Sequence, residues 1–176
     1  MKFCYYTSFK NISKLIFIGL ALSSLAAMAN QPSNRMSPEG LHSVISNYAN
    51  QVTLNNNVIS FQYQSVSLYC IWDASADRMR IIAPIANTSD LSELHFELAL
   101  KANYHTVLDA RYAIGDGIMY SAFIHPLSSI NKVEIESAIR QVSSAALTFG
   151  TSFSSGELSF PEQTNEKAKG GNEQSL

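Results

Sequence analysis

The sequence predicts an α+β fold in which helices pack against one antiparallel sheet. Three observations lead to this prediction. Runs of alternating apolar and polar residues indicate strands, apolar residues spaced three and four apart indicate helices, and short turn-forming segments join consecutive strands. Taken along the chain, these patterns give the element order α-β-β-β-α-β-β-α.

The first helix is expected to begin at residue 37 and to end near residue 50. Ser37 is favourable as an N-cap, and Pro38 is favourable at the first helical position. Apolar residues follow at positions i, i+3, i+4 and i+7: Leu41, Val44, Ile45 and Tyr48. This spacing places them on one face of a helix, which should pack against the rest of the domain.

Three strands are expected over residues 58–64, 66–73 and 78–85, after a turn at the asparagine cluster 55–57. The first alternates between apolar and polar residues, whereas the second has large apolar residues on both faces. The third reaches Pro84, which cannot donate to a ladder, so this strand ends there or lies at an edge. The second and third strands should be antiparallel neighbours, because their connection is short.

A second helix is expected over residues 91–104, with Asp90 and Glu93 as its capping box. Its apolar stripes are Leu91, Leu94, His95, Leu98 and Ala102, and then Phe96, Leu100 and Tyr104. Two stripes predict either burial on most sides or burial on one face and contact with another molecule on the other.

Residues 109–125 are expected to form a hairpin around Gly115-Asp116-Gly117, because glycine and aspartate tolerate the positive φ of a tight turn. A two-residue loop at Asp116-Gly117 would mix apolar and polar residues on both faces. We favour a three-residue loop, because a single apolar face fixes strand register. That face would consist of Tyr112, Ile114, Ile118, Tyr120 and Ile124.

The last helix is expected over residues 131–149, capped by Asn131 and Glu134 and followed by Gly150. The folded domain is therefore expected to span residues 37–150. A flexible lead (30–36) precedes it, and a polar tail (151–176) that we expect to be mostly disordered follows it.

Residues 1–29 are typical of a secretory signal peptide. Lys2, Lys10 and Lys14 precede an apolar run at 15–22, and the segment ends in Ala27-Met28-Ala29, with small residues where a signal peptidase cleaves. The apolar run is short for a membrane span of roughly 20 residues. We expect cleavage after Ala29 and a periplasmic or secreted protein without a stable membrane span, with an uncleaved anchor as the alternative.

The mature chain is acidic and has one cysteine. Without the three lysines, nine of the twelve basic residues remain against fourteen acidic ones, a net charge of −5. This balance argues against nucleic acid or an anionic membrane as the main partner. Cys70 cannot form an internal disulfide, and its apolar surroundings predict a buried side chain; an intermolecular disulfide or a reactive thiol is the alternative.

The histidines do not form a metal-binding pattern. No two of them have a metal-ligand spacing, and they are His42, His95, His105 and His125. His95 lies on an apolar stripe, so we expect it to pack in the core. His105 could pair with Asp109, although a solvated helix end is the simpler interpretation.

The aspartates also have a structural interpretation. Asp73, Asp77, Asp109 and Asp116 fall in turns or at strand ends, where aspartate forms local hydrogen bonds. The sequence has no G-x-S-x-G motif and no phosphate loop. We therefore assign no catalytic, cofactor-binding or metal residue, and expect a protein that is not an enzyme and has no cofactor.

Four segments of the chain follow one another in an order found in a known family. They are residues 79–85, the helix end at 98–103, the hairpin start at 110–117, and residues 124–127 before the last helix. Together with the element order over residues 37–150, they resemble the class I type III secretion chaperone fold. That family includes the Tir chaperones and the similar YbjN-like proteins.

The resemblance implies a small, acidic, non-enzymatic protein, often a homodimer. Members bind an extended segment of a partner protein through apolar patches and added strand pairing. Those chaperones act in the cytosol, whereas this sequence begins with an export signal. The resemblance identifies no individual binding residue in this chain.

We therefore expect an exported, non-enzymatic domain that binds a protein partner through apolar surface. The surplus of apolar residues on strand 66–73 and helix 91–104 favours this function if it is exposed, and otherwise indicates a larger core. One alternative is an enzyme in which His105 or His125 approaches Asp109 or Asp116. Another is a structural envelope protein that oligomerises through its sheet edge.

Overall fold

The computed structural model describes residues 35–156. The helices are α2 (Pro38–Tyr48), α3 (Glu93–His105) and α4 (Lys132–Thr148), with a 3-10 turn at Thr88–Asp90. The strands are β1 (Asn50–Asn55), β2 (Val58–Tyr63), β3 (Val66–Asp73), β4 (Arg78–Asn87), β5 (Arg111–Gly115) and β6 (Ile118–His125). The predicted signal peptide, residues 30–34 of the predicted lead and residues 157–176 of the predicted tail lie outside the described residues.

One antiparallel sheet contains all six of these strands, in the order β1-β2-β3-β4-β6-β5. The predicted α+β class with a single antiparallel sheet is therefore confirmed. The structure adds β1, which pairs with β2 through a turn at Asn56. Sequence patterns missed β1 because it is an edge strand whose residues are almost all exposed, so it lacks apolar alternation.

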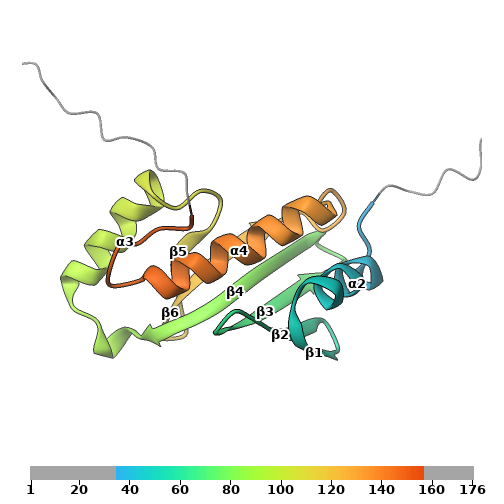
Figure 1. The fold of residues 1–176 in the computed structure, drawn as a ribbon, viewed down its shortest axis with the longest axis horizontal. Helices are drawn as coiled ribbons and strands as arrows, with labels where there is room; N and C mark the ends of the chain where they lie inside the picture. Colours follow the sequence, from blue (N-terminus) through green and yellow to red (C-terminus); the bar gives the residue numbers. More distant parts are fainter. Residues whose placement is uncertain (1–34, 157–176) are drawn as a thin grey trace, which may run out of the picture. The chain divides into compact units, whose positions relative to one another are not determined.

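Helices α4 and α2 cover one face of this sheet (Figure 1). Helix α4 lies along the strands, and α2 packs beside it near β1. The side chains between helices and sheet form the larger of two cores, which includes Ile59, Leu68, Ile81, Ile135 and Ile139, all fully buried. A smaller core joins α3, β5 and the end of α4, and includes Ala99, Val107, Tyr112, Met119, Ala145 and Phe153.

The β5–β6 hairpin has a two-residue turn, so the favoured three-residue loop was wrong. Asp116 and Gly117 have φ values of 49° and 78°, and Gly115 pairs directly with Ile118. Positive φ at both central positions is what a type I′ hairpin turn requires. The single-face argument failed because both faces of the sheet are apolar here: Tyr112 lies on the helix side and Tyr120 on the opposite side.

Two of the three predicted helix starts are confirmed, and one was wrong. Ser37 Oγ accepts from Gly40 N at 3.1 Å, and Asn131 forms the predicted capping box with Glu134. Helix α3, however, is capped by Ser92, whose backbone N–H donates to His95 Nδ1 at 3.2 Å. The predicted cap residue, Asp90, belongs instead to the preceding 3-10 turn.

The chain remains packed against the domain for several residues after Gly150. Phe153 is buried in the smaller core, and Ser155 is buried beside the end of α3. Ser155 Oγ accepts from Leu108 N at 2.8 Å, and Ser155 N donates to Thr106 O at 3.3 Å. The folded domain thus continues to residue 156. Its sequence there is polar around one phenylalanine, which is why composition alone placed the boundary at Gly150.

Candidate functional site

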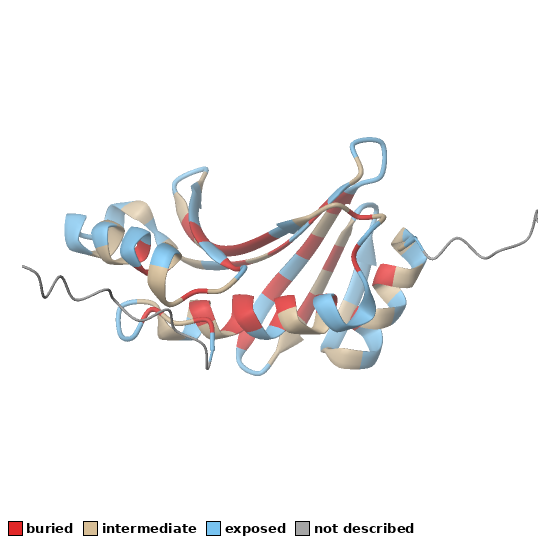
Figure 2. Cartoon of the chain, turned by 90° about the horizontal axis from the view of Figure 1, so that it is seen from above, coloured by how far each residue is buried: buried red, intermediate tan, exposed pale blue. Residues whose placement is uncertain are grey.

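The sheet face opposite α2 and α4 has no helix on it in the part of the chain that the structure describes (Figure 2). We call this surface the open face. Strand alternation and the ladder registers assign its side chains. From β2 to β5 they include Val58, Ser60, Gln62, Ser67, Tyr69, Ile71, Asp73, Arg78, Arg80, Ile82, Pro84, Ile118, Tyr120, Ala122, Ile124, Arg111 and Ala113.

Apolar side chains from three neighbouring strands lie together on the open face. Tyr69 on β3 is opposite Ile82 on β4, and Ile82 is opposite Ala122 on β6. We call this group the apolar stripe. It consists of the exposed Tyr69 and Ile124, the half-buried Ile71, Ile82 and Tyr120, and the buried Ala122. Ile124 on β6 is 63% exposed and Tyr69 on β3 is 37% exposed, so both edges of this group present large apolar side chains to solvent.

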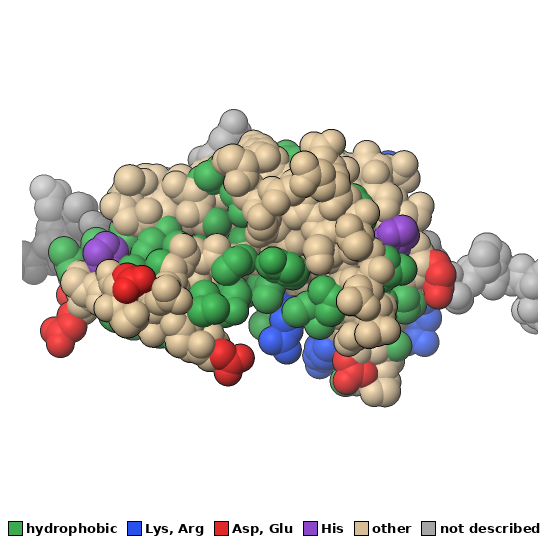
Figure 3. Space-filling view, turned by 90° about the horizontal axis from the view of Figure 1, so that it is seen from below, with side chains coloured by type: hydrophobic (Ala, Val, Ile, Leu, Met, Phe, Trp, Pro, Cys, Tyr) green, Lys and Arg blue, Asp and Glu red, His purple; other side chains and the backbone are tan. Residues whose placement is uncertain are grey.

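One arginine lies within the apolar stripe, and two lie beside it. Arg80 lies between Ile71 and Ile124 in the ladder. Arg111 is opposite Ala122, and Arg78 is opposite Asp73, the last residue of β3. None of the three forms an ion pair among residues 35–156. In the space-filling view, apolar side chains gather in the middle of one face with Lys and Arg side chains beside them (Figure 3).

A hollow lies at the arginine end of the open face. Its volume is about 450 Å³, and its lining includes Ile71, Arg78, Arg80 and Ile124. At the same end, the Asp73 carboxylate accepts hydrogen bonds from the Ser75 hydroxyl at 2.6 Å and from two backbone amides, which lowers its pKa. This carboxylate therefore closes its own turn.

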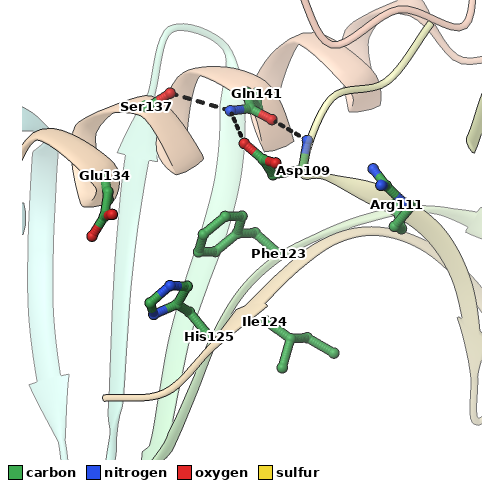
Figure 4. Close-up of a pocket in the computed structure, with 8 residues that line it drawn as sticks. All are labelled: Asp109, Arg111, Phe123, Ile124, His125, Glu134, Ser137 and Gln141. Carbon is green, nitrogen blue, oxygen red and sulfur yellow. Dashed lines mark hydrogen bonds between the residues drawn. The ribbon is translucent and has the colours of Figure 1, made fainter. Parts of the chain in front are cut away.

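A second pocket, of about 410 Å³, lies between α4 and the start of β5 (Figure 4). It is lined by Asp109, Arg111, Phe123, Ile124, His125, Glu134, Ser137 and Gln141. The side chain of Gln141 is almost fully buried and accepts from the backbone N–H groups of Asp109, at 2.8 Å, and Ala110, at 3.2 Å. This buried amide fixes the loop that leads into β5.

The predicted approaches between histidine and aspartate take other forms. His125 and Asp109 line the same pocket, but His125 Nδ1 is 2.9 Å from Pro126 O, and the Asp109 carboxylate accepts from Gln141 Nε2. The ring of His105 is edge-on to Tyr104, and its buried Nδ1 has no hydrogen-bond partner among the described residues. Asp116 occupies the exposed hairpin turn.

The remaining predicted residues have structural positions. The prediction that His95 packs in the core was wrong: its ring is half-buried, caps α3 through Ser92 and stacks on Phe149. His42 lies on α2 with Nε2 3.4 Å from Ser46 Oγ. Asp77 accepts from Ser128 N at 2.7 Å and from Ser128 Oγ at 2.8 Å, which lowers its pKa.

Cys70 is fully buried in the larger core, as its apolar surroundings predicted. Burial raises the pKa of its thiol to about 12. No set of three His, Cys, Asp or Glu side chains between residues 35 and 156 is arranged for a metal ion. Within the same range, no helix is both long and apolar enough to span a membrane.

The predicted second stripe of α3 is mostly exposed. Leu100 is 70% exposed and Tyr104 is 77% exposed, whereas Ala99 and Ala102 on the opposite side are buried. The apolar surplus in the sequence therefore has two locations: the open face of the sheet and the outer side of α3. The sequence indicated the surplus but could not assign it to surfaces, because this depends on which sheet face the helices cover.

Comparisons with known proteins show similarity in structure. Neither a family model nor a curated protein matches the sequence. A chain in the structure of the HopA1–SchA chaperone–effector complex matches with a TM-score of 0.49 and 10% identity, over 62% of this chain and 88% of that one. A chain of the ExsC–ExsE complex matches with a TM-score of 0.49 and 12% identity, over 63% and 91%. The chain is thus similar in fold to chains of these two complexes, and no residue role is transferred from them.

Proposed function

We propose that this chain is an exported, non-enzymatic domain that binds an extended segment of a partner protein on its open face. The apolar stripe is the observation that supports the proposal. Single exposed apolar residues are common, but a group contributed by β3, β4 and β6 forms one continuous surface. An extended segment fits such a surface because its alternate side chains can face the sheet.

The arginines define the chemistry of the partner. A segment that crosses the apolar stripe meets Arg78, Arg80 and Arg111, whose guanidinium groups have no ion-pair partner among the described residues. Carboxylates are the natural partners for guanidinium, since the two can form paired hydrogen bonds. We therefore infer a partner segment with both large apolar and acidic side chains.

A second copy of this chain fits the open face less well. A twofold contact would place the same surface on both sides, so that Arg80 in the middle of the face would meet a region of like charge. Such a contact costs free energy unless acidic residues intervene, and the open face offers few. A different protein with complementary charge avoids this repulsion.

Export is the second part of the proposal, and the pattern of residues 1–29 supports it. Fractionation of cells that produce the full chain, followed by determination of the N-terminus, tests this part. We expect a protein outside the cytoplasm that begins at Asn30. A full-length chain retained in the cytoplasm would contradict export and leave the open-face proposal to its own test.

Selection from a displayed library of random peptides on the purified mature chain tests the binding face. We expect enriched peptides to combine apolar and acidic residues, and to shift the amide resonances of β3, β4 and β6. The double variant Ile71→Glu, Ile124→Glu should bind them at least about tenfold more weakly, because each glutamate is charged where apolar contact is required.

Val133→Glu is the matched control, because Val133 is 70% exposed on α4, away from the open face. It should leave peptide binding unchanged. Peptides that bind the double variant as tightly as the wild type would overturn the proposal, as would enriched peptides that contact the helices instead. Analytical ultracentrifugation of the free chain completes the test: a dimer disrupted by the double variant would identify a second copy as the occupant.

A further inference from the structure

The pocket between α4 and the start of β5 has a distinct chemical character. Its volume is about 410 Å³, and its lining includes two carboxylates, one guanidinium, a phenyl ring, an imidazole and a free strand edge. This volume is within the range of small-molecule sites. Its ligand is a separate question from the partner of the open face, because only Ile124 and Arg111 belong to both surfaces.

The pocket exists because β5 is shorter than β6. The last ladder pair between them is Arg111 with Ala122, and β6 continues to His125. Gln141 accepts from the amides of Asp109 and Ala110, which turns the chain away from β6. Hydrogen-bonded pairs alternate along the hairpin, so the N–H and C=O of Ile124 face this gap, where no strand lies beside them.

The charged side chains around the gap use only part of their hydrogen-bonding capacity within the domain. The Asp109 carboxylate accepts from Gln141 Nε2 at 3.2 Å, and Glu134 accepts from Asn131 N at 2.8 Å. Nη1 of Arg111 donates to the carbonyls of the preceding loop. None of these three side chains forms an ion pair in the described part of the chain.

The charges lie at different places around the pocket. Figure 4 shows Arg111 at one end and Glu134 at the other, with the ring of Phe123 between them and Asp109 above it. A ligand with charges of opposite sign at its two ends matches this arrangement. The ring of Phe123, stacked on His125 with centroids 5.9 Å apart, provides an apolar floor between the charges.

We propose that this pocket binds a free short peptide of two or three residues. The α-ammonium group lies at Glu134, the terminal carboxylate at Arg111, and an apolar side chain on Phe123 between them. The peptide bond pairs with the free N–H and C=O of Ile124. A single amino acid has no peptide bond to satisfy that edge, and the end of a longer protein lacks one of the two terminal charges.

Titration of the mature chain with Leu-Leu, followed by heteronuclear NMR, tests this proposal. We expect saturable shifts at the amides of residues 123–125 and 109–111. N-acetyl-Leu-Leu and Leu-Leu-amide each lack one terminal charge, so each should bind about tenfold more weakly or worse, and free leucine should also be weaker. If both blocked peptides bind as tightly as Leu-Leu, or if none of these ligands shifts those amides, the proposal is wrong.

Substitutions of the charged side chains test which of them binds each end of the peptide. Glu134→Gln removes the carboxylate but keeps an oxygen that can accept from Asn131 N, so the start of α4 is preserved. Arg111→Gln removes the guanidinium. Each should weaken Leu-Leu binding about tenfold, whereas Glu136→Gln, on the same helix but paired with Lys132, should have no effect. Equal binding by Glu134→Gln and wild type would also overturn the assignment.

One further variant separates this proposal from the open-face function. Ile71 lies on the open face and does not line this pocket. Ile71→Glu should therefore weaken binding of the selected peptides while Leu-Leu binds normally. Loss of Leu-Leu binding in a folded Ile71→Glu variant would show that the two surfaces are one site, and would contradict a separate pocket.

Discussion

Cys70 illustrates how burial controls the chemistry of a single side chain. Its neighbours across the sheet are Ile59 on β2 and Ile81 on β4, and all three side chains are fully buried. Because a thiolate is costly in apolar surroundings, burial raises the pKa of this thiol to about 12. The thiolate is the reactive form, so the folded protein should protect Cys70 from thiol reagents.

We expect the mature chain to react with Ellman's reagent at pH 8 at least about a hundredfold more slowly when folded than when unfolded in urea. At this pH the raised pKa leaves the thiol almost fully protonated, and lowering the pH should slow the reaction further. The Cys70→Ser variant is the control and should not react in either state. A native rate equal to the rate in urea would show that Cys70 is accessible and would contradict its place in the core.

The roles of other residues depend on partners that are distant in the sequence. The burial of Cys70 could be predicted, because its own neighbours are apolar. Asp109, by contrast, is fixed by Gln141, 32 residues further along the chain, and no local pattern indicates this contact. His95 was misassigned for a local reason: a histidine at the third helical position can cap Ser92, a role usually filled by Glu or Gln.

At the scale of elements, sequence patterns predicted the three α-helices and five of the six strands found between residues 35 and 156. Strand β1 escaped because its edge position leaves it without an apolar face. The register of the β5–β6 hairpin was predicted wrongly for the opposite reason. With apolar residues on both faces of β5 and β6, alternation could not determine the turn, and the conformation of Asp116-Gly117 decided it.

The hairpin turn makes different predictions for its two glycines. Gly117 has φ of +78°, where a Cβ is strained, so Gly117→Ala should lower the free energy of unfolding by about 1 kcal/mol. Gly115 does not have positive φ, and a Cβ there would be 3.6 Å from the Tyr120 ring, an ordinary contact. Gly115→Ala is therefore the matched control.

Urea unfolding of both variants, read by circular dichroism, measures the difference. We expect Gly115→Ala to unfold within about 0.5 kcal/mol of the wild type. If the two substitutions cost the same, the turn does not have the two-residue geometry described. A three-residue loop would then be the better assignment, and the residues of the open face would change with it.

At the scale of the whole domain, one arrangement explains both the stability and the proposed binding. The helices α2 and α4 cover one face of the sheet, so its other face can remain apolar and exposed (Figure 2). Sequence alone could not predict which apolar residues would be exposed, because the exposed Tyr69 and the buried Cys70 both lie in the same apolar run. The covering helices, which are distant in sequence, decide between them.

Helix α4 also joins the two cores, since Val142 packs in the larger core and Ala145, one turn later, packs in the smaller. We therefore expect the domain to unfold as one cooperative unit. Phe153→Ala should lower the free energy of unfolding by about 3 kcal/mol, because loss of the buried ring leaves a cavity in the smaller core. The single tryptophan of the chain, Trp72, lies in the larger core and reports on that core alone.

Tryptophan fluorescence and circular dichroism should consequently show the same lowered urea midpoint for Phe153→Ala, although the substitution does not lie in the core that contains Trp72. Thr151→Ala is the control, because Thr151 is exposed and its hydroxyl bonds only to the nearby Thr148 carbonyl. If the fluorescence midpoint stays at the wild-type value while the dichroism signal falls earlier, the cores unfold separately. Residues 151–156 would then be an appendage to the domain, and α4 would not transmit stability from one core to the other.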